Sequence, residues 1–354
     1  MKTVSKISMN VQEPSVMYER AVTILNSKSP SSRAFRKALE QIRSIAKDGC
    51  AFAQDYMGYL YHNGFGVDRD IFEAINWYKL SAIQGNVDSQ LSLGDIYLQG
   101  VEVEQDYDEA GKWYQRAAEQ QHPQGQTNLG VMHCYGHGVD QDYVEAGKWY
   151  LLAANQDYPP AQYYLGFMYE NGIGVDQDYD KAVNWYQRAA DYGDAEAPNR
   201  LGFMYENGIG VEQDYDEAVK WYRLAANYLN AEARNRLGAM YENGIGVEQD
   251  YDEALNWYRR AAFFCHPEAQ NSLGVMHRDG VGVDQSYDEA LNWFKAAAEQ
   301  QYVLALRNLG AMYENGLGVI RDYAEALKWY QLAEDQGDAL AQDALIEMRY
   351  ETTN

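Results

Sequence analysis

The tryptophans of this chain recur at a constant interval of 36 residues. All eight lie on one series without insertion or deletion: Trp77, Trp113, Trp149, Trp185, Trp221, Trp257, Trp293 and Trp329. A glycine column from Gly58 to Gly310 and a valine column from Val67 to Val319 keep the same interval. A fixed period of this length is typical of stacked structural units and not of one globular catalytic core. Eight units are therefore predicted across residues 53–340.

Each unit is predicted to contain two helices. In the copy at 233–244, Leu237, Met240 and Tyr241 recur at helical spacing and form one apolar face. In the copy at 250–262, Asp250 and Glu253 form a capping box, in which Asp caps the first-turn amides and Glu reaches back. The tryptophan column and three tyrosine columns are interpreted as core between repeats, because stacked units bury one continuous apolar layer.

The stretch GIGVEQDYDEA links the two helices and stands at both 208–218 and 244–254. It lacks the third glycine of a dinucleotide-binding loop and does not follow a strand. The best calcium candidate, which begins at Asp176, has Lys181 and Gln187 where a calcium loop needs Gly and Glu. The stretch is therefore interpreted as a helix C-cap, a tight turn with a buried valine, and an N-cap.

The repeated pattern A-x-x-x-L-G-x-M-Y-x-x-G-x-G-V-x-x-D-Y-x-E-A-x-x-W-Y-x-x-A-A resembles the Sel-one-like repeat family, relatives of the tetratricopeptide repeat. The resemblance implies an all-α fold, an α/α solenoid in which antiparallel helix pairs form a right-handed superhelix. It also implies protein–protein interaction by non-catalytic adaptors, many of them bacterial. The family has a disulfide-rich branch, from which this chain departs because Cys50, Cys134 and Cys265 share no column.

The ends of the chain are predicted to cap the stack. Residues 1–12 are expected to form a disordered basic tail, 13–52 a degenerate capping repeat, and 341–354 a capping helix and tail. The sequence has neither the apolar segment of a secretory signal nor a run long enough to span a membrane. A cytoplasmic location is expected, and non-classical secretion stays open.

The charge of the chain is strongly acidic and unevenly placed. The net charge is −24 at pH 7. Nine Lys/Arg against four Asp/Glu give +5 in residues 1–52, so the remaining residues carry −29. Such a field repels nucleic-acid phosphates and anionic lipids and favours basic partners. We therefore expect a protein partner with a basic and apolar segment, no nucleic acid or membrane, and a monomer or weak self-association.

The variable positions of the first helices form the predicted partner-binding face. In solenoids of this kind the first helices line the concave surface, by analogy with the family. The candidate residues are Tyr59, Asp95, Tyr163, Phe167, Glu170, Phe203, Glu206, Asn235, Glu242 and Arg278. Aromatic side chains ringed by charge are typical of binding hot spots. The alternative is that Phe167 and Phe203 only pack against the next repeat.

Catalysis and metal binding have little support in the sequence. His133 and His137 stand four residues apart with Cys134 between them, but no carboxylate completes a metal site. The common hydrolase, P-loop and zinc-protease motifs are missing. We expect no cofactor and no enzymatic activity. Three functions remain, in this order: an adaptor; an inhibitor, immunity protein or bacterial effector that occludes a basic toxin or enzyme; and an enzyme or cell-wall-fragment binder.

Overall fold

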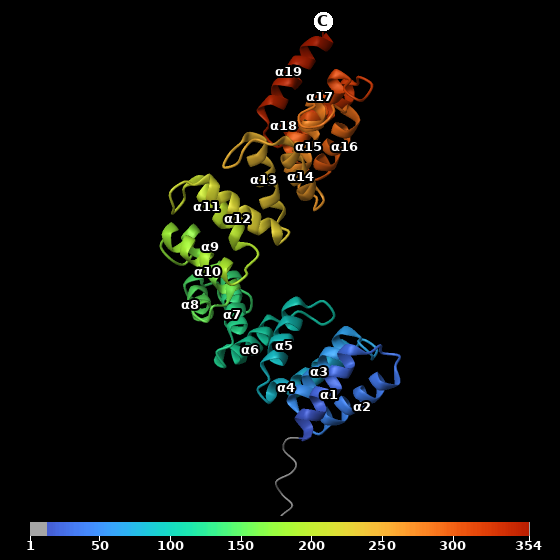
Figure 1. The fold of residues 1–354 in the computed structure, drawn as a ribbon, viewed down its shortest axis with the longest axis vertical. Coiled ribbons are helices and arrows are strands. Elements are labelled where there is room, and N and C mark those ends of the chain that lie inside the picture. Colours follow the sequence, from blue (N-terminus) through green and yellow to red (C-terminus); the bar gives the residue numbers. More distant parts are fainter. Residues whose placement is uncertain (1–12, 354) are drawn as a thin grey trace, which may run out of the picture. The chain divides into compact units, whose positions relative to one another are not determined.

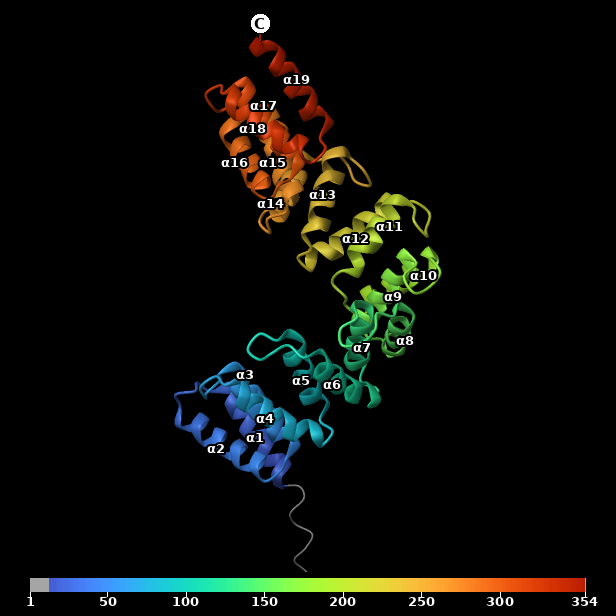
Figure 2. The same cartoon turned by 180° about the vertical axis from the view of Figure 1, so that it is seen from behind.

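The computed structural model describes the backbone of residues 13–353 and shows it as stacked helix pairs (Figures 1 and 2). The tail predicted for residues 1–12 lies outside the described residues. Those described contain no strand, which confirms the all-α solenoid. The helices are α1 (Glu13–Ser27), α2 (Arg33–Lys47), α3 (Ala51–Asn63), α4 (Ile71–Ile83), α5 (Val87–Gln99), α6 (Tyr107–Glu119), α7 (Pro123–Tyr135), α8 (Tyr143–Ala154), α9 (Pro159–Asn171), α10 (Tyr179–Asp191), α11 (Ala197–Asn207), α12 (Tyr215–Asn227), α13 (Ala231–Asn243), α14 (Tyr251–Ala262), α15 (Pro267–Asp279), α16 (Tyr287–Glu299), α17 (Val303–Asn315), α18 (Tyr323–Glu334) and α19 (Ala339–Thr353).

The chain divides into two compact units, Met1–Gln177 and Asp178–Asn354. Within each unit, the first helix of a repeat packs on its second helix, as α3 does on α4 and α13 on α14. The second helix then packs on the first helix of the next repeat. First helices also touch one another, as α7 touches α9 and α11 touches α13. A row of neighbouring first helices therefore lines one side of each unit.

The aromatic residue that follows each tryptophan, a tyrosine in all repeats but the seventh, is the most deeply buried aromatic residue of the repeat. Tyr114, Tyr150, Tyr186 and Tyr222 are almost completely buried. The glycine of the L-G pair lies under this ring, because a β-carbon at Gly238 would come within 2.6 Å of the Tyr258 ring. The glycine column therefore exists to admit the ring.

The tryptophan column is less buried than predicted. Only Trp113 is buried, and the other seven tryptophans are half-buried. In three repeats an arginine three residues later covers the exposed face of the indole at 4.6 Å from the ring centre: Arg116 over Trp113, Arg188 over Trp185 and Arg260 over Trp257. Most of these tryptophans still pack against the core clusters, as predicted. Helical spacing indicates the face on which a residue lies but not its depth, so the half-buried position was not predictable from it.

The linking stretch has the capping and turn roles predicted for it, with one difference. Gly208 and Gly210 adopt the left-handed conformation, with φ of 66° and 67°. Gln213 donates from Nε2 to the carbonyl of Glu206 at 2.8 Å, which satisfies the end of the first helix. The valine of the turn is only half-buried, and Val139 is 39% exposed, so the prediction of a buried valine was wrong.

Only half of the predicted capping box forms. Asp214 accepts a hydrogen bond from the amide of Glu217 at 2.9 Å, as predicted. The amide of Asp214 itself donates to the carbonyl of Tyr205 in the first helix at 3.0 Å. Because that amide is already satisfied, Glu217 turns to Lys220 and forms an ion pair at 2.6 Å. The reciprocal contact predicted for the glutamate was therefore wrong.

A column of buried side-chain donors, which was not predicted from the sequence, caps the carboxyl ends of the second helices. Gln54, Gln90 and Gln162 are buried, and each donates from Nε2 to a carbonyl near the end of the preceding second helix, at 3.0–3.2 Å. Arg234 stands on the same column and donates from Nη2 to the carbonyl of Ala226 at 3.0 Å. Buried carbonyls at helix ends need such donors, so the column is structural.

Leu229→Gly is expected to stabilise the protein by about 0.5–1 kcal/mol. Leu229 stands just beyond α12 with φ of 68°, a conformation that strains any residue with a β-carbon. Its side chain is 59% exposed, so removing it loses little packing. Urea unfolding measures the effect. Gly193→Ala, at the same position of another repeat with φ of 91°, should change stability in the opposite direction. Equal signs for the two variants would contradict the argument.

Candidate functional site

The first helices α7 and α9 enclose a pocket of about 310 Å³ together with the start of α8. Its lining residues are Cys134, Tyr135, Gln141, Tyr143, Tyr150, Tyr163, Tyr164, Phe167, Met168 and Ile173. Two of the predicted binding residues, Tyr163 and Phe167, are thus brought together in one pocket. We call it the α7–α9 pocket. Its volume is at the low end of the range of about 300–1,000 Å³ that is usual for ligand pockets.

Stacked tyrosines form the inner wall of the α7–α9 pocket. Tyr164 stacks on Tyr150 with ring centres 4.9 Å apart and planes at 16°. Tyr163 meets Tyr164 edge-on at 6.0 Å. Tyr150 donates its hydroxyl to the Sγ of Cys134 at 3.5 Å, and burial raises the pKa of both groups. The thiol therefore stays protonated, which makes Cys134 a wall of the pocket and not a nucleophile.

The lining of the α7–α9 pocket suits an apolar side chain of another molecule. None of its lining residues carries a charge, and most of them are aromatic. Tyr135 and Tyr143 are exposed at its edge, where their hydroxyls can form hydrogen bonds with the backbone of a bound peptide. Aromatic walls with polar tips favour an apolar or aromatic guest that enters from water.

The other predicted residues of the first unit lie elsewhere on its first helices. Tyr59 is exposed, and its ring lies 5.8 Å from that of Tyr56. Asp95 is half-buried and accepts the hydroxyl of Tyr114 at 2.6 Å, while burial raises the pKa of this carboxyl. Glu170 is half-buried on α9.

The predicted residues of the second unit are mostly engaged in internal contacts. Phe203 is half-buried on α11, and Asn235 is buried. Arg278 makes a bidentate ion pair with Asp279 at 2.7 and 2.8 Å. The structure therefore assigns internal partners or a buried position to several members of the predicted face.

The glutamate column of the predicted face supports the buried tyrosines. Glu206, Glu242 and Glu314 accept the hydroxyls of the tyrosines sixteen residues later, Tyr222, Tyr258 and Tyr330, at 2.5–2.7 Å. In the seventh repeat both members change together, since Arg278 replaces the glutamate and Phe294 replaces the tyrosine. This paired change is the signal in the sequence for the contact between the two columns.

Tyr258→Phe is expected to lower the free energy of unfolding by about 1.5 kcal/mol, because it leaves the Glu242 carboxylate without its donor. The double variant Tyr258→Phe/Glu242→Arg copies the seventh repeat and should recover most of the loss. Urea unfolding of the two variants gives the comparison. A double variant no more stable than the single one would show that the pair is not coupled.

One of the two histidines singled out in the sequence, His137, packs against an aromatic ring. The ring of His137 stacks on that of Tyr107 with centres 4.5 Å apart. Within residues 16–348, whose side chains the structure describes, no three or more His, Cys, Asp or Glu side chains lie together as a metal would require. No helix in this range is long and apolar enough to cross a membrane.

Comparison with known proteins agrees with the repeat. The family described as Sel1 repeat matches eight segments: 51–86, 87–122, 123–158, 159–194, 195–227, 231–262, 267–302 and 303–338. The chain is similar to c5321, a protective antigen of uropathogenic Escherichia coli strains, at 36% identity and a TM-score of 0.80 over 88% of this chain and 67% of that one. It is also similar to a Sel1 repeat protein from Oxalobacter formigenes, at 32% identity and a TM-score of 0.68 over 98% of each chain.

No curated protein matches the sequence significantly. The eight matched segments cover most of the chain and agree with the eight copies read from the tryptophan series. Proteins of this family are generally protein–protein interaction scaffolds, and their fold is typically non-catalytic. The chain belongs to the Sel1 repeat family.

Proposed function

We propose that this protein is a non-catalytic scaffold that holds a segment of a partner protein along its first helices. An apolar side chain of the partner occupies the α7–α9 pocket. The observation that carries the proposal is an uncharged aromatic pocket to which positions that vary between repeats contribute Tyr163, Tyr164 and Phe167. At the position of Phe167 the other repeats have Tyr59, Asp95, Val131, Phe203, Ala239, Val275 and Ala311. Stacking therefore does not demand an aromatic ring there.

The acidic surface supports a basic partner. Residues 53–354 carry a net charge of −29, so a segment with Lys or Arg next to its apolar anchor is drawn to this surface. Specificity then comes from the anchor in the uncharged pocket, and the charge mainly raises the rate of encounter. The three free cysteines suit a reducing compartment such as the cytoplasm.

Affinity capture from a lysate of the source organism tests the proposal. Wild-type protein, Tyr163→Ser/Phe167→Ser and Phe263→Ser are immobilised, and bound proteins are identified by mass spectrometry at low and high salt. Phe263 is 81% exposed and lies outside the α7–α9 pocket, so its variant controls for the loss of surface aromatic area.

The proposal predicts a partner that survives high salt, binds the Phe263→Ser control and is lost with the pocket variant. A diffuse set of basic proteins that high salt removes would contradict it. If the partner is a toxin or an enzyme whose activity stops on binding, the scaffold acts as an inhibitor.

A further inference from the structure

The turn of the second repeat lacks a contact that the other seven turns make. Their second glycine packs on an aromatic residue in the first turn of the preceding second helix, and a β-carbon on Gly138 would come within 3.0 Å of Tyr107. The same relation holds for Gly66, Gly174, Gly210, Gly246, Gly282 and Gly318. In the second repeat Glu102 replaces the glycine and Ile71 replaces the aromatic residue. A glutamate side chain does not fit against the preceding helix, so this turn cannot dock in the same way.

The backbone of this turn follows a different path. In other repeats the amide after the capping glycine donates to a carbonyl five residues earlier, as His137 does to Met132 at 3.0 Å. Val101, at the same place in the second repeat, has no such bond among the described residues, and its side chain is 79% exposed. Glu102 instead reaches Arg69, with Oε1 and Nη2 2.5 Å apart. The tip of the turn at Val101 and Glu102 therefore follows its own path, while Val103 still packs against the core cluster that contains Ile71 and Ile75.

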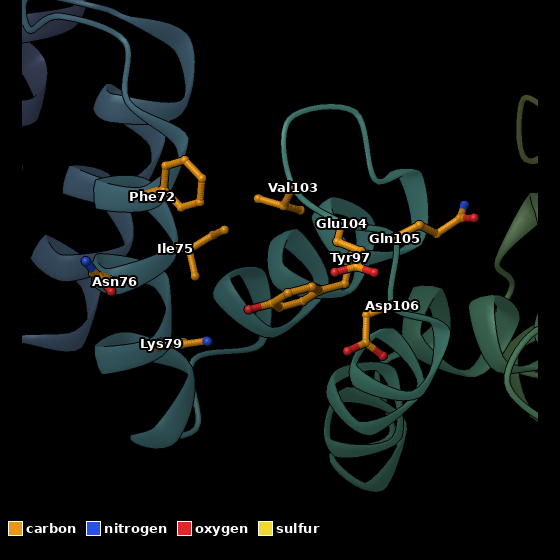
Figure 3. A pocket seen from close by; sticks show the side chains of 9 residues that line it. All are labelled: Phe72, Ile75, Asn76, Lys79, Tyr97, Val103, Glu104, Gln105 and Asp106. Atoms are coloured by element: carbon orange, nitrogen blue, oxygen red, sulfur yellow. The ribbon is translucent and has the colours of Figure 1, made fainter.

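The displaced turn leaves a cleft of about 640 Å³ between α4 and residues 103–106 (Figure 3). Phe72 and Ile75 project from α4 toward Val103 on the turn (Figure 3). Phe72 is 66% exposed, and five other repeats have an aspartate at its position: Asp108, Asp180, Asp216, Asp252 and Asp288. Phe72 therefore gives the wall of this cleft an apolar surface that those five repeats lack. We call this the α4 cleft.

The rim of the α4 cleft is acidic. Glu104 and Asp106 line the cleft on the side of the turn (Figure 3). The Asp106 carboxylate also caps α6, where its Oδ1 accepts a hydrogen bond from the amide of Glu109 at 2.9 Å. The one cation of the lining, Lys79, has its Nζ 5.4 Å above the ring centre of Tyr97. Lys79 therefore lies beside an aromatic face. The exposed Glu104 carboxylate and the second oxygen of Asp106 can attract a guest of positive charge.

We propose that the α4 cleft is a second docking site, separate from the α7–α9 pocket, for a partner segment that presents an apolar side chain next to Lys or Arg. The apolar side chain lies between Phe72, Ile75 and Val103, and the basic group faces Glu104 and Asp106. The inference does not depend on what fills the α7–α9 pocket. On this proposal, the second repeat departs from the shared pattern because its turn forms part of a binding site.

Methyl NMR of the full chain tests the proposal with two peptide probes. Resonances of Ile75 and Val103 are followed during titration with acetyl-Leu-Lys-Leu-Lys-amide and, as its counterpart, acetyl-Leu-Glu-Leu-Glu-amide. The basic probe should shift both residues in a saturable way, and the acidic probe should not. Equal shifts with both probes, or none with the basic one, would overturn the proposal.

Three variants and a control connect any shift to the α4 cleft. Ile71→Tyr/Glu102→Gly restores the shared turn and closes the cleft, so it should abolish the response. Phe72→Asp removes the apolar wall from an exposed position and should do the same without affecting the fold. Glu104→Gln should weaken binding about two- to fivefold at low salt. Glu248→Gln, at the same place in the turn of the sixth repeat, is the matched control and should bind like wild type. Binding that survives in both Ile71→Tyr/Glu102→Gly and Phe72→Asp would place the probe elsewhere.

Discussion

Gly238→Ala is expected to lower the free energy of unfolding by about 2 kcal/mol, although it adds only one methyl group. The new β-carbon would lie 2.6 Å from the Tyr258 ring, which is buried and held in place by its bond to Glu242. Forcing a side chain into a packed core costs about 1–3 kcal/mol, and the helix propensity of alanine returns at most about 1 kcal/mol. Because the Tyr258 ring cannot move aside, the cost of the clash should be at the upper end of about 1–3 kcal/mol, so the protein is destabilised overall.

Gly147→Ala is the matched control for this substitution. Gly147 also lies within a helix, but its added β-carbon would meet only the end of the Met168 side chain, with Cε at 3.2 Å and Sδ at 3.8 Å. Because a methionine end can move aside, this variant should be neutral or slightly stabilising. Urea unfolding of both variants decides the matter. If Gly238→Ala were as stable as Gly147→Ala, the ring would not explain the glycine of the L-G pair.

Tyr163→Ser/Phe167→Ser is expected to weaken binding of the captured partner about 100-fold, or about 2.7 kcal/mol. The two rings form one side of the α7–α9 pocket, so their removal takes away the aromatic walls that would enclose the apolar anchor. Calorimetric titration of the purified partner measures the loss. Phe263→Ser should bind like wild type, since Phe263 lies outside the pocket.

The stability of the same double variant separates binding from packing. Tyr163 and Phe167 are half-buried, so the free energy of unfolding should fall by no more than about 1 kcal/mol. A much larger fall would mean that these rings mainly hold neighbouring repeats together, which is the alternative that the sequence left open. In that case the change in affinity could not be assigned to the pocket.

Much of the fold could be predicted because each repeat carries the same physical signals. The spacing of Leu237, Met240 and Tyr241 predicted a helix, and Gly244 predicted its end. The structure ends α13 at Asn243, with Gly244 in the left-handed conformation as C-cap. How deeply a side chain is buried, and which of two possible hydrogen-bond partners a group selects, could not be predicted in this way. Glu217 does not bind the amide of Asp214, because that amide already donates to the carbonyl of Tyr205 in another helix. Glu217 pairs with Lys220 instead.

The candidate site could be predicted only in part. Tyr163 and Phe167 were found because they lie on the variable face of a first helix, at positions that helical spacing identifies. Tyr143 was missed because it begins a second helix, and the approach of that helix to α9 is a tertiary contact. The α4 cleft did have a signal in the sequence, since Glu102 interrupts an otherwise constant glycine column.

Site-specific photo-cross-linking in living cells tests the central claim most directly. A photoreactive phenylalanine analogue replaces Phe167 in one protein and Phe263 in another, and cross-linked products are identified after irradiation. Our account predicts one predominant partner joined through position 167, by a peptide that contains an apolar residue next to Lys or Arg, and no such product through position 263. The same partner joined only through position 263, or an unselective set of products from both positions, would contradict it.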